Sequence, residues 1–189
     1  MSSKNYLSIY AKSFNWAGFF LPKKTYKNCS YLYDFCRVVD NIADDEGEIE
    51  IKKVKFQKFV SDFKQKNFEN PVIQNMWNII HEFNISLEII YDLFDGIESD
   101  IKQNVKIDTR KDLLIYCYRV AGTVGLMMAK ILNVNKKQSL KSAIDLGIAM
   151  QLTNISRDVI EDSKKNRSYI NGNFEEINST IKLADTFYK

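Results

Sequence analysis

Residues 33–46, YDFCRVVDNIADDE, combine carboxylates with apolar side chains in a pattern that fits a packed α-helix. At the pitch of an α-helix, polar residues lie at i, i+4, i+7 and i+11, along one face: Tyr33, Arg37, Asp40 and Asp44. The other faces carry residues that can pack against a core: Phe35, Val38, Val39 and Ile42. The segment therefore predicts a helix that buries its apolar sides and keeps one polar stripe, which we call the first ladder.

A second helix repeats this arrangement closer to the C-terminal end of the chain. In residues 149–162, AMQLTNISRDVIED, polar residues lie at i, i+3, i+7 and i+11: Gln151, Asn154, Asp158 and Asp162. We call this stripe the second ladder. The other faces of the helix carry apolar residues: Ile148, Leu152, Ile155, Val159 and Ile160. Carboxylates at i and i+4 repel each other and destabilise a helix, so the two ladders predict that something cationic lies between them.

The side chains of the ladders favour a hard metal ion. Asp40 and Asp44 are one turn apart, about 6 Å along the helix axis, so their oxygen atoms can bind the same cation or neighbouring ones. Oxygen ligands without His or Cys favour Mg²⁺, with Mn²⁺ as the alternative, and Mg²⁺ commonly keeps waters and binds substrate phosphates. Arg37 and Arg157, one beside each ladder, add positive charge for phosphate oxygens. A single Asp pair of this spacing more often marks a solvated face, whereas the repetition favours a metal site.

The 189 residues predict one all-α domain over 1–189. Only 2 Pro and 7 Gly interrupt long stretches rich in Leu, Ile, Lys and Glu, which favours helices. Helices are predicted at about residues 3–15, 25–45, 49–68, 71–83, 86–103, 110–132, 136–164 and 174–187.

Several helix ends carry local signals. Pro71 fits a first helical position, Ser86 and Thr109 fit N-caps, and Asn173 with Glu176 fits a capping box. Gly47 and Gly172 follow acidic helices, where a left-handed residue would end each helix.

Composition points to a cytoplasmic protein. The cysteines Cys29, Cys36 and Cys117 fit no metal-binding spacing and are predicted to be ordinary thiols. The N-terminus lacks the unbroken apolar run of a signal peptide, and the most apolar region is interrupted by Arg119 and Lys130, so no membrane span is predicted. The net charge of +3 comes without a block of like charge, so no nucleic-acid partner is predicted, and peripheral membrane association stays open.

Four segments, in this order, resemble the squalene and phytoene synthases, the head-to-head prenyl diphosphate synthases. They are AKSFNWAGFFLP, YLYDFCRVVDNIADD, YCYRVAGTVG and LGIAMQLTNISRDVIED, and the similarity extends from Tyr10 to Tyr169. The last two segments look most like bacterial phytoene synthases. The resemblance implies an isoprenoid synthase fold, a helical bundle around a central apolar cavity, with two Asp-rich helices facing each other across its mouth.

The resemblance also implies roles for individual residues. Five positions match the metal-binding residues of the two Asp-rich motifs: Asp40, Asp44, Asn154, Asp158 and Asp162. Substrate-binding positions are Tyr10, Lys12, Ser13, Tyr33, Arg37, Tyr116, Val120, Asn154 and Arg157, where Val120 belongs to the stretch that lines the cavity. The implied catalytic set is Arg37, Asp40, Asp44, Tyr116 and Asp158. Asn41 departs from the family, because many members carry Asp there.

The implied activity is a Mg²⁺-dependent condensation of two geranylgeranyl diphosphates to phytoene, a step of carotenoid biosynthesis, without NADPH. Two alternatives stay open: squalene or dehydrosqualene synthesis from farnesyl diphosphate, and a non-catalytic helical protein that binds a prenyl lipid or a partner. Family members continue well beyond the second ladder, so the C-terminal third of the usual domain has no counterpart here. We expect either a longer chain or a partner that completes the cavity.

The segment YCYRVAGTVG contains two glycines, Gly122 and Gly125, that weaken a helix. One interpretation is an opened or kinked helix that lets a long substrate pass close to the backbone. The other is close packing of two helices.

Overall fold

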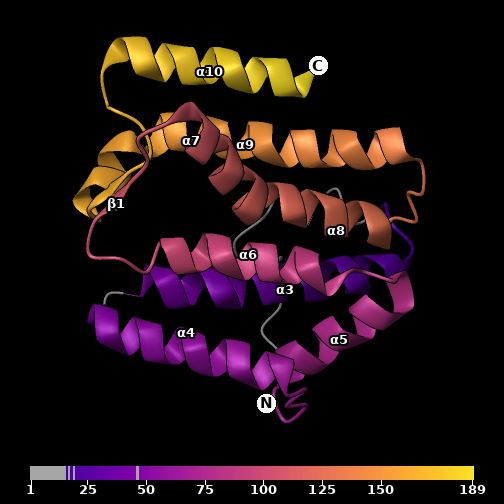
Figure 1. Cartoon of the computed structure of the whole chain (residues 1–189). Coiled ribbons are helices and arrows are strands. Elements are labelled where there is room, and N and C mark those ends of the chain that lie inside the picture. Colours follow the sequence, from indigo (N-terminus) through magenta and orange to yellow (C-terminus); the bar gives the residue numbers. More distant parts are fainter. Residues whose placement is uncertain (1–15, 17, 19, 46) are drawn as a thin grey trace. The chain divides into compact units, whose positions relative to one another are not determined.

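The computed structural model describes residues 16, 18, 20–45 and 47–189 (Figure 1). In chain order its elements are α3 (Lys23–Asp44), α4 (Ile49–Lys64), α5 (Pro71–Phe83), α6 (Leu87–Ser99), β1 (Val105–Lys106), α7 (Arg110–Cys117), the π-helix η1 (Tyr118–Gly122), α8 (Thr123–Ile131), α9 (Lys137–Lys164), β2 (Arg167–Ser168) and α10 (Phe174–Tyr188). The predicted all-α class is confirmed. The helix predicted at residues 3–15 lies outside the described residues.

The observed helices follow the predicted ranges closely. α5 spans the predicted residues, and α9 begins one residue after its predicted start and ends where predicted. α4 and α6 are each four residues shorter than predicted at their C-terminal ends, at Lys64 and Ser99. Lys66 has a φ of 56°, and such a left-handed residue cannot continue a right-handed helix, which explains the early end of α4.

The predicted helix starts are confirmed where side chains cap the backbone. Pro71 lies in the first turn of α5, and the Asn70 side chain accepts a hydrogen bond from the Val72 N–H. Thr109 caps α7 by accepting from the Asp112 N–H at 3.1 Å. Asn173 caps α10 by accepting from the Glu176 N–H at 2.8 Å, while the Glu176 carboxylate accepts from the Asn171 N–H. α6 begins one residue after Ser86.

The prediction that glycines end helices was wrong. None of the described glycines, Gly47 and Gly172 included, has a positive φ. The left-handed residues among those described are Lys66, Asn84, Asn133 and Asn166. Asn tolerates this conformation better than most side chains because its short polar group can hydrogen-bond locally. Asn166 follows α9, whereas α3 is followed by Asp45 with a φ of −53° and so ends without a left-handed residue.

The chain forms two compact units. Unit 1 comprises the described residues up to Leu87 together with Met127–Val134, and unit 2 comprises Glu88–Leu126 and Asn135–Lys189. In unit 1, both α4 and α5 pack on α3 (Figure 1). Its core is aromatic: the Phe63 ring lies 5.6 Å from that of Phe35 and stacks on Trp77 at 5.2 Å. The Trp77 indole N–H donates to the Phe63 carbonyl at 3.0 Å, so the buried polar atom of the indole is satisfied.

In unit 2, α9 packs against α10, α7 and η1 (Figure 1). The core of this unit is a cluster of buried residues that includes Leu113, Cys117, Ile148, Leu152, Ile155 and Ala184. A short parallel strand pair, which the sequence did not predict, joins β1 and β2 with Val105 opposite Arg167 and Lys106 opposite Ser168. This pair connects the segment before α7 to the segment after α9.

The helix predicted at 110–132 is interrupted by a π-helix. In η1 the Thr123 N–H donates to the Tyr118 carbonyl, five residues earlier, and the Thr123 hydroxyl donates to the Arg119 carbonyl at 2.7 Å. A methyl group on Gly125 would overlap the Ala143 carbonyl of α9, and one on Gly147 would overlap the Ala121 carbonyl. The close helix packing is therefore confirmed, and it occurs where the helix departs from regular α-helical geometry; the passage of a long substrate close to this backbone stays a prediction.

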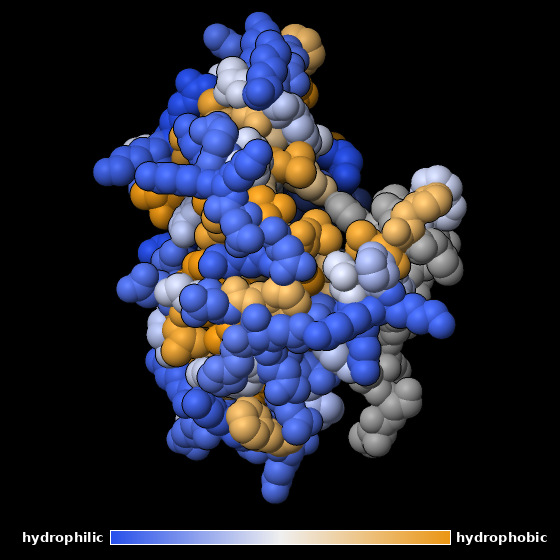
Figure 2. Space-filling view, turned by 90° about the vertical axis from the view of Figure 1, so that its right-hand side faces the viewer, coloured by the Kyte–Doolittle hydropathy of each residue, from blue (hydrophilic) through white to orange (hydrophobic). Residues whose placement is uncertain are grey.

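The segment Arg110–Ile131 is long and apolar enough, by length and composition, to cross a membrane, and 39% of its most apolar window is buried inside the protein. Core helices of soluble proteins pass the same test, so the prediction of a chain without a membrane span stays a prediction. On the face in Figure 2, hydrophobic residues lie in separate groups between hydrophilic ones.

Candidate functional site

The first ladder lies half-buried along one side of α3. Tyr33, Arg37, Asp40 and Asp44 are all of intermediate exposure. They are held there because Leu32, Phe35 and Val39, on another face of α3, are fully buried in the core of unit 1. The Arg37 guanidinium donates a hydrogen bond from Nη1 to Asp40 Oδ2 at 2.8 Å. The predicted stripe is therefore present, and its arginine is bonded to one of its carboxylates.

Burial and neighbouring charges raise the pKa values of two further groups on α3, the Tyr33 hydroxyl and the Cys36 thiol. Burial raises the pKa of the Tyr33 hydroxyl; Arg37 opposes this shift, and the negative charge of Asp40 adds to it. Burial raises the pKa of the Cys36 thiol to about 12, again with a contribution from Asp40. Cys29, Cys36 and Cys117 are free. A thiolate is the form that binds metals, so a neutral Cys36 is a poorer donor for a metal ion than the carboxylates of this face.

The second ladder lies on α9 in the same half-buried state. Gln151, Asn154, Asp158 and Asp162 have intermediate exposure, while Leu152 and Ile155 are buried in the core of unit 2. Ile160, expected on a packing face, is instead 73% exposed. The Arg157 guanidinium binds the Asp158 carboxylate through two hydrogen bonds, of 2.7 and 2.6 Å. These bonds lower the pKa of the Asp158 carboxyl, so it is ionised at neutral pH.

Each ladder thus pairs an arginine with an aspartate. Ion pairs with this degree of exposure contribute at most about 1 kcal/mol to the free energy of folding. A bound anion or cation can therefore replace either partner with little loss of stability. A guanidinium has five N–H donors in a planar fork, and the pairing orients it beside the carboxylate. Arg37 and Arg157 are therefore suited to bind phosphate oxygens beside the aspartates of the ladders.

The donor atoms of the ladders suit Mg²⁺. Among the described residues, no group of three or more His, Cys, Asp or Glu is arranged to hold a metal. Asp40 and Asp44 offer two carboxylates on α3, while Asp158, Asp162 and the Asn154 amide offer oxygen atoms on α9. Such a sparse, all-oxygen set fits an ion that keeps several waters and takes ligands from substrate phosphates. α3 belongs to unit 1 and α9 to unit 2, and the predicted metal site stays a prediction.

Tyr116 lies in a hydrogen-bonded cluster that the sequence did not predict. It is 8% exposed, and its hydroxyl donates to the Asp100 carboxylate at 2.8 Å. The Tyr169 hydroxyl donates to the other oxygen of that carboxylate at 2.7 Å. Asp100 follows α6 and Tyr169 follows β2, and neither belongs to a periodic pattern, so no signal in the sequence marked them.

The remaining predicted substrate-binding residues are distributed as follows. Val120 is half-buried in η1. Here the Tyr118 hydroxyl donates to Asp92 at 3.0 Å, and Arg119 pairs with Asp95 at 3.3 Å. Both contacts tie the π-helix to α6. Tyr10, Lys12 and Ser13 lie outside the described residues.

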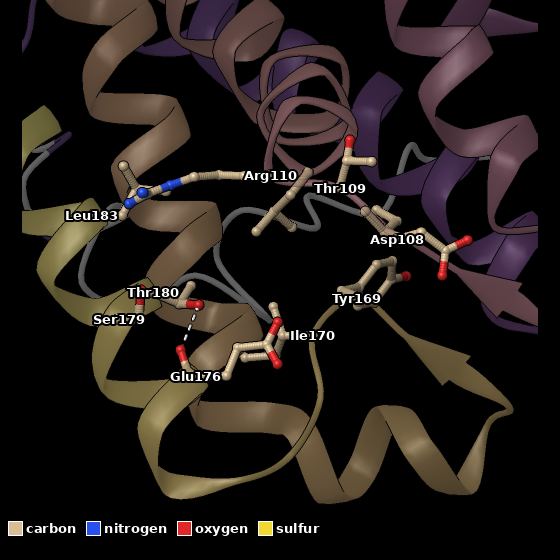
Figure 3. Close-up of a pocket in the computed structure, with 11 residues that line it drawn as sticks. Asp108, Thr109, Arg110, Tyr169, Ile170, Glu176, Ser179, Thr180 and Leu183 are labelled. Carbon is tan, nitrogen blue, oxygen red and sulfur yellow. Dashed lines mark hydrogen bonds between the residues drawn. The ribbon is translucent and has the colours of Figure 1, made fainter.

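A separate small pocket lies between the start of α7 and α10 in unit 2 (Figure 3). Its volume is about 130 Å³, and Arg110, Tyr169, Glu176 and Thr180 are among its lining residues. In Figure 3, Arg110 extends from α7 toward α10. Sites for small organic ligands usually measure at least about 300 Å³, and neither ladder lines this pocket. It is therefore distinct from the candidate site.

Comparisons with known proteins identify relatives of this chain. A phytoene synthase from Pseudescherichia vulneris is 32% identical over 172 residues, covering 85% of this chain and 55% of that protein. A 4,4'-diapophytoene synthase from Staphylococcus haemolyticus is 31% identical over 193 residues, covering 95% of this chain and 67% of that protein. The chain thus spans about half to two thirds of the length of these relatives.

The structure supports the same relationship. A crystal structure of a dehydrosqualene synthase in complex with a ligand superimposes with a TM-score of 0.83 and 28% sequence identity, covering 98% of this chain and 73% of that one. The predicted isoprenoid synthase fold is thereby confirmed. The family model for squalene/phytoene synthase matches residues 7–172, a range that includes both ladders. The chain belongs to the squalene/phytoene synthase family.

Proposed function

We propose that the protein is a prenyltransferase that joins two molecules of geranylgeranyl diphosphate head to head and forms phytoene. The observation that carries the proposal is the pair of half-buried ladders, each with an arginine bonded to an aspartate. Phytoene synthases among the relatives support the choice of product. The substrates of this chain are prenyl diphosphates, whose charged ends suit the ladders.

In the proposed reaction, Arg37 and Arg157 bind diphosphate oxygens and stabilise the negative charge that grows as the allylic C–O bond breaks. Asp40, Asp44, Asn154, Asp158 and Asp162 would hold Mg²⁺, or Mn²⁺ as the alternative, which when bound neutralises diphosphate charge. The double bond of the second prenyl chain attacks the allylic cation, and the resulting cation loses a proton as the three-membered ring closes, which gives a cyclopropyl diphosphate.

The second half of the reaction, like the first, involves no oxidation or reduction. The remaining diphosphate leaves with its bonding electron pair, the carbon skeleton rearranges, and loss of a proton yields phytoene. No hydride is added, so NADPH is not consumed. Apolar surroundings keep water from the cations. We extend the proposal to a peripheral contact with the membrane, where the long substrate and product reside, and to a further segment or partner that completes the cavity.

Farnesyl diphosphate is the second candidate substrate. The dehydrosqualene synthase structure covers 98% of this chain, and the diapophytoene synthase aligns with 95% of it. Incubation with farnesyl or geranylgeranyl diphosphate and Mg²⁺, with and without NADPH, distinguishes the two when the hydrocarbon is identified by mass. A non-catalytic protein would give no hydrocarbon in this assay. Binding is tested separately with a non-hydrolysable prenyl diphosphate. If the protein bound no diphosphate, this compound would not raise the melting temperature in the presence of Mg²⁺.

The metal assignment is tested with Asp40→Asn and Asp158→Asn. We expect each variant to lower Mg²⁺-dependent product formation by at least about 100-fold, because several kcal/mol of charge stabilisation are lost. Both side chains are partly exposed, so the fold should remain intact by circular dichroism. Asp185→Asn, at an exposed position of α10, is the matched control and should keep wild-type activity. Wild-type turnover in both ladder variants would rule out the assignment.

A further inference from the structure

A buried ring of hydroxyl and carboxylate groups lies in unit 2. Asp100, Tyr116 and Tyr169 are 9%, 8% and 6% exposed. The Tyr116 hydroxyl donates to Asp100 Oδ2 at 2.8 Å, and the Tyr169 hydroxyl donates to Asp100 Oδ1 at 2.7 Å. The two hydroxyl oxygens are 3.1 Å apart. Both carboxylate oxygens therefore accept a hydrogen bond from a phenol, which suits a charged group at this depth.

The two tyrosine rings also restrict each other. They stack with their centroids 4.7 Å apart and their planes 21° apart. Tyr169 follows β2 (Figure 3), and the pairing of β2 with β1 fixes its backbone. β1 in turn lies a few residues beyond Asp100. The short strand pair therefore brings Tyr169 to Asp100 and Tyr116, which gives this unexpected feature of the fold a specific role.

Burial and the charge of Asp100 together raise the pKa of the Tyr116 hydroxyl. Burial is the main cause that raises the pKa of Tyr116 well above its ordinary value, and the charge of Asp100 adds to it. Burial and Asp100 raise the pKa of Tyr169 as well. A tyrosine with an ordinary pKa is already neutral at physiological pH, and the raised pKa values keep both phenols neutral in more alkaline solution as well. The acceptors of the Tyr116 hydroxyl are Asp100 at 2.8 Å and the Tyr169 hydroxyl at 3.1 Å, so its single proton is used within the cluster, with Asp100 as the nearer acceptor, rather than for a ligand.

We propose that Asp100 is a positioning residue for Tyr116. Together with Tyr169 it fixes the Tyr116 hydroxyl by accepting a hydrogen bond from it. Tyr116 then presents its aromatic face and its hydroxyl oxygen to a ligand. The inference rests on the proposed function, in which Tyr116 contacts the substrate. It adds Asp100 and Tyr169 to the residues on which the reaction depends.

A first measurement tests the ring without any substrate. Buried hydroxyl protons bonded to a carboxylate exchange slowly and give downfield proton NMR signals, which Tyr116→Phe and Tyr169→Phe assign. Asp100→Asn keeps the shape of the side chain but turns one acceptor into a donor, so the Tyr116 signal should shift upfield or disappear. Asp92→Asn is the matched control, because Asp92 accepts from Tyr118, two residues along the same segment. The control should leave the Tyr116 and Tyr169 signals in place.

A second measurement tests positioning. We expect Asp100→Asn to lower kcat by about tenfold or more and to change KM by less than about threefold, since a charge-assisted hydrogen bond is lost while the ligand-binding arginines remain. Tyr169→Phe, which keeps the stacked ring, should reduce kcat in the same direction by less. It keeps the test valid if Asp100→Asn fails to fold.

The outcomes separate the inference from the proposed function. Unchanged hydroxyl signals in Asp100→Asn would overturn the inference, and so would a lost Tyr116 signal with wild-type kcat. If wild-type protein forms no hydrocarbon from either prenyl diphosphate, the proposed function fails, and the hydroxyl signals then decide whether the ring exists as described.

Discussion

The two units of the chain have cores of different chemistry. In unit 1 the centre is aromatic and apolar: the Phe35 ring contacts those of Phe59 and Phe63, and Phe63 stacks on Trp77. In unit 2 the interior holds a carboxylate bonded to two tyrosines, and glycines allow α9 and η1 to approach backbone to backbone. Unit 1 therefore depends mainly on apolar volume, whereas unit 2 has an apolar cluster of its own and depends in addition on directional hydrogen bonds and on glycines at its helix contacts.

The two cores are therefore expected to lose stability in response to opposite changes in side-chain size. An apolar core loses stability when side chains are made smaller, because a cavity remains. A tightly packed seam loses stability when a side chain is made larger, because rigid backbone atoms cannot move aside. A buried carboxylate–phenol ring adds a dependence on pH that apolar residues lack.

The largest effect is expected for Phe63→Ala in unit 1. Phe63 is 0% exposed and lies between Phe35 and Trp77, so truncation should lower the free energy of unfolding by about 4 kcal/mol. Urea unfolding measures the change, and hydrogen exchange assigns it to unit 1. Phe68→Ala is the control, because Phe68 is 47% exposed, and it should cost less than about 1 kcal/mol. Equal losses in the two variants would contradict an aromatic core centred on Phe63.

A somewhat smaller effect is expected for Gly125→Ala in unit 2. The added methyl group would overlap the Ala143 carbonyl, so we expect a loss of about 3 kcal/mol. Gly47→Ala is the matched control, since no described atom lies within 4 Å of the added methyl group. Urea unfolding of both variants is the measurement. A neutral Gly125→Ala would mean that α8 and α9 are not packed as closely as described.

The smallest effect concerns pH. The pKa of the Tyr116 hydroxyl is raised in the folded chain from its ordinary value of 10.0, mainly by burial. Above pH 10 the unfolded chain therefore releases a proton that the folded chain keeps, and stability is lost as pH rises. In Tyr116→Phe this slope should be smaller by up to about 1.4 kcal/mol per pH unit. Urea unfolding at pH 9 and 11 compares the two proteins, and identical slopes would contradict a buried, neutral Tyr116.

The fold could be predicted where the signals are local. α5 has the expected bounds because Pro71 and an apolar repeat mark it, and Thr109 and Asn173 cap helices as their sequence context suggested. The π-helix could not be predicted. The glycines mark a weak point in the helix, but contacts with α6, such as Tyr118 with Asp92, accompany the extra residue in the turn.

The candidate site also has residues that the sequence predicted and residues that only the structure revealed. The ladders follow from helical periodicity, and the pairing of Arg37 with Asp40 is a contact between neighbours on one helix. The partners of Tyr116 are 16 and 53 residues away in the chain. No periodic pattern connects positions so far apart, which is why Asp100 and Tyr169 were missing from the predicted site.

The sequence by itself determined the helical class, the two ladders and, through ordered motifs, the family. Those features depend on residues within a few helical turns of one another, whose geometry the α-helix imposes. Only the tertiary structure decided the left-handed helix ends, the strand pair, the π-helix and the buried ring of Asp100, Tyr116 and Tyr169. Each of the last three depends on contacts between segments distant in the chain, and such contacts exist only once the core has brought those segments together.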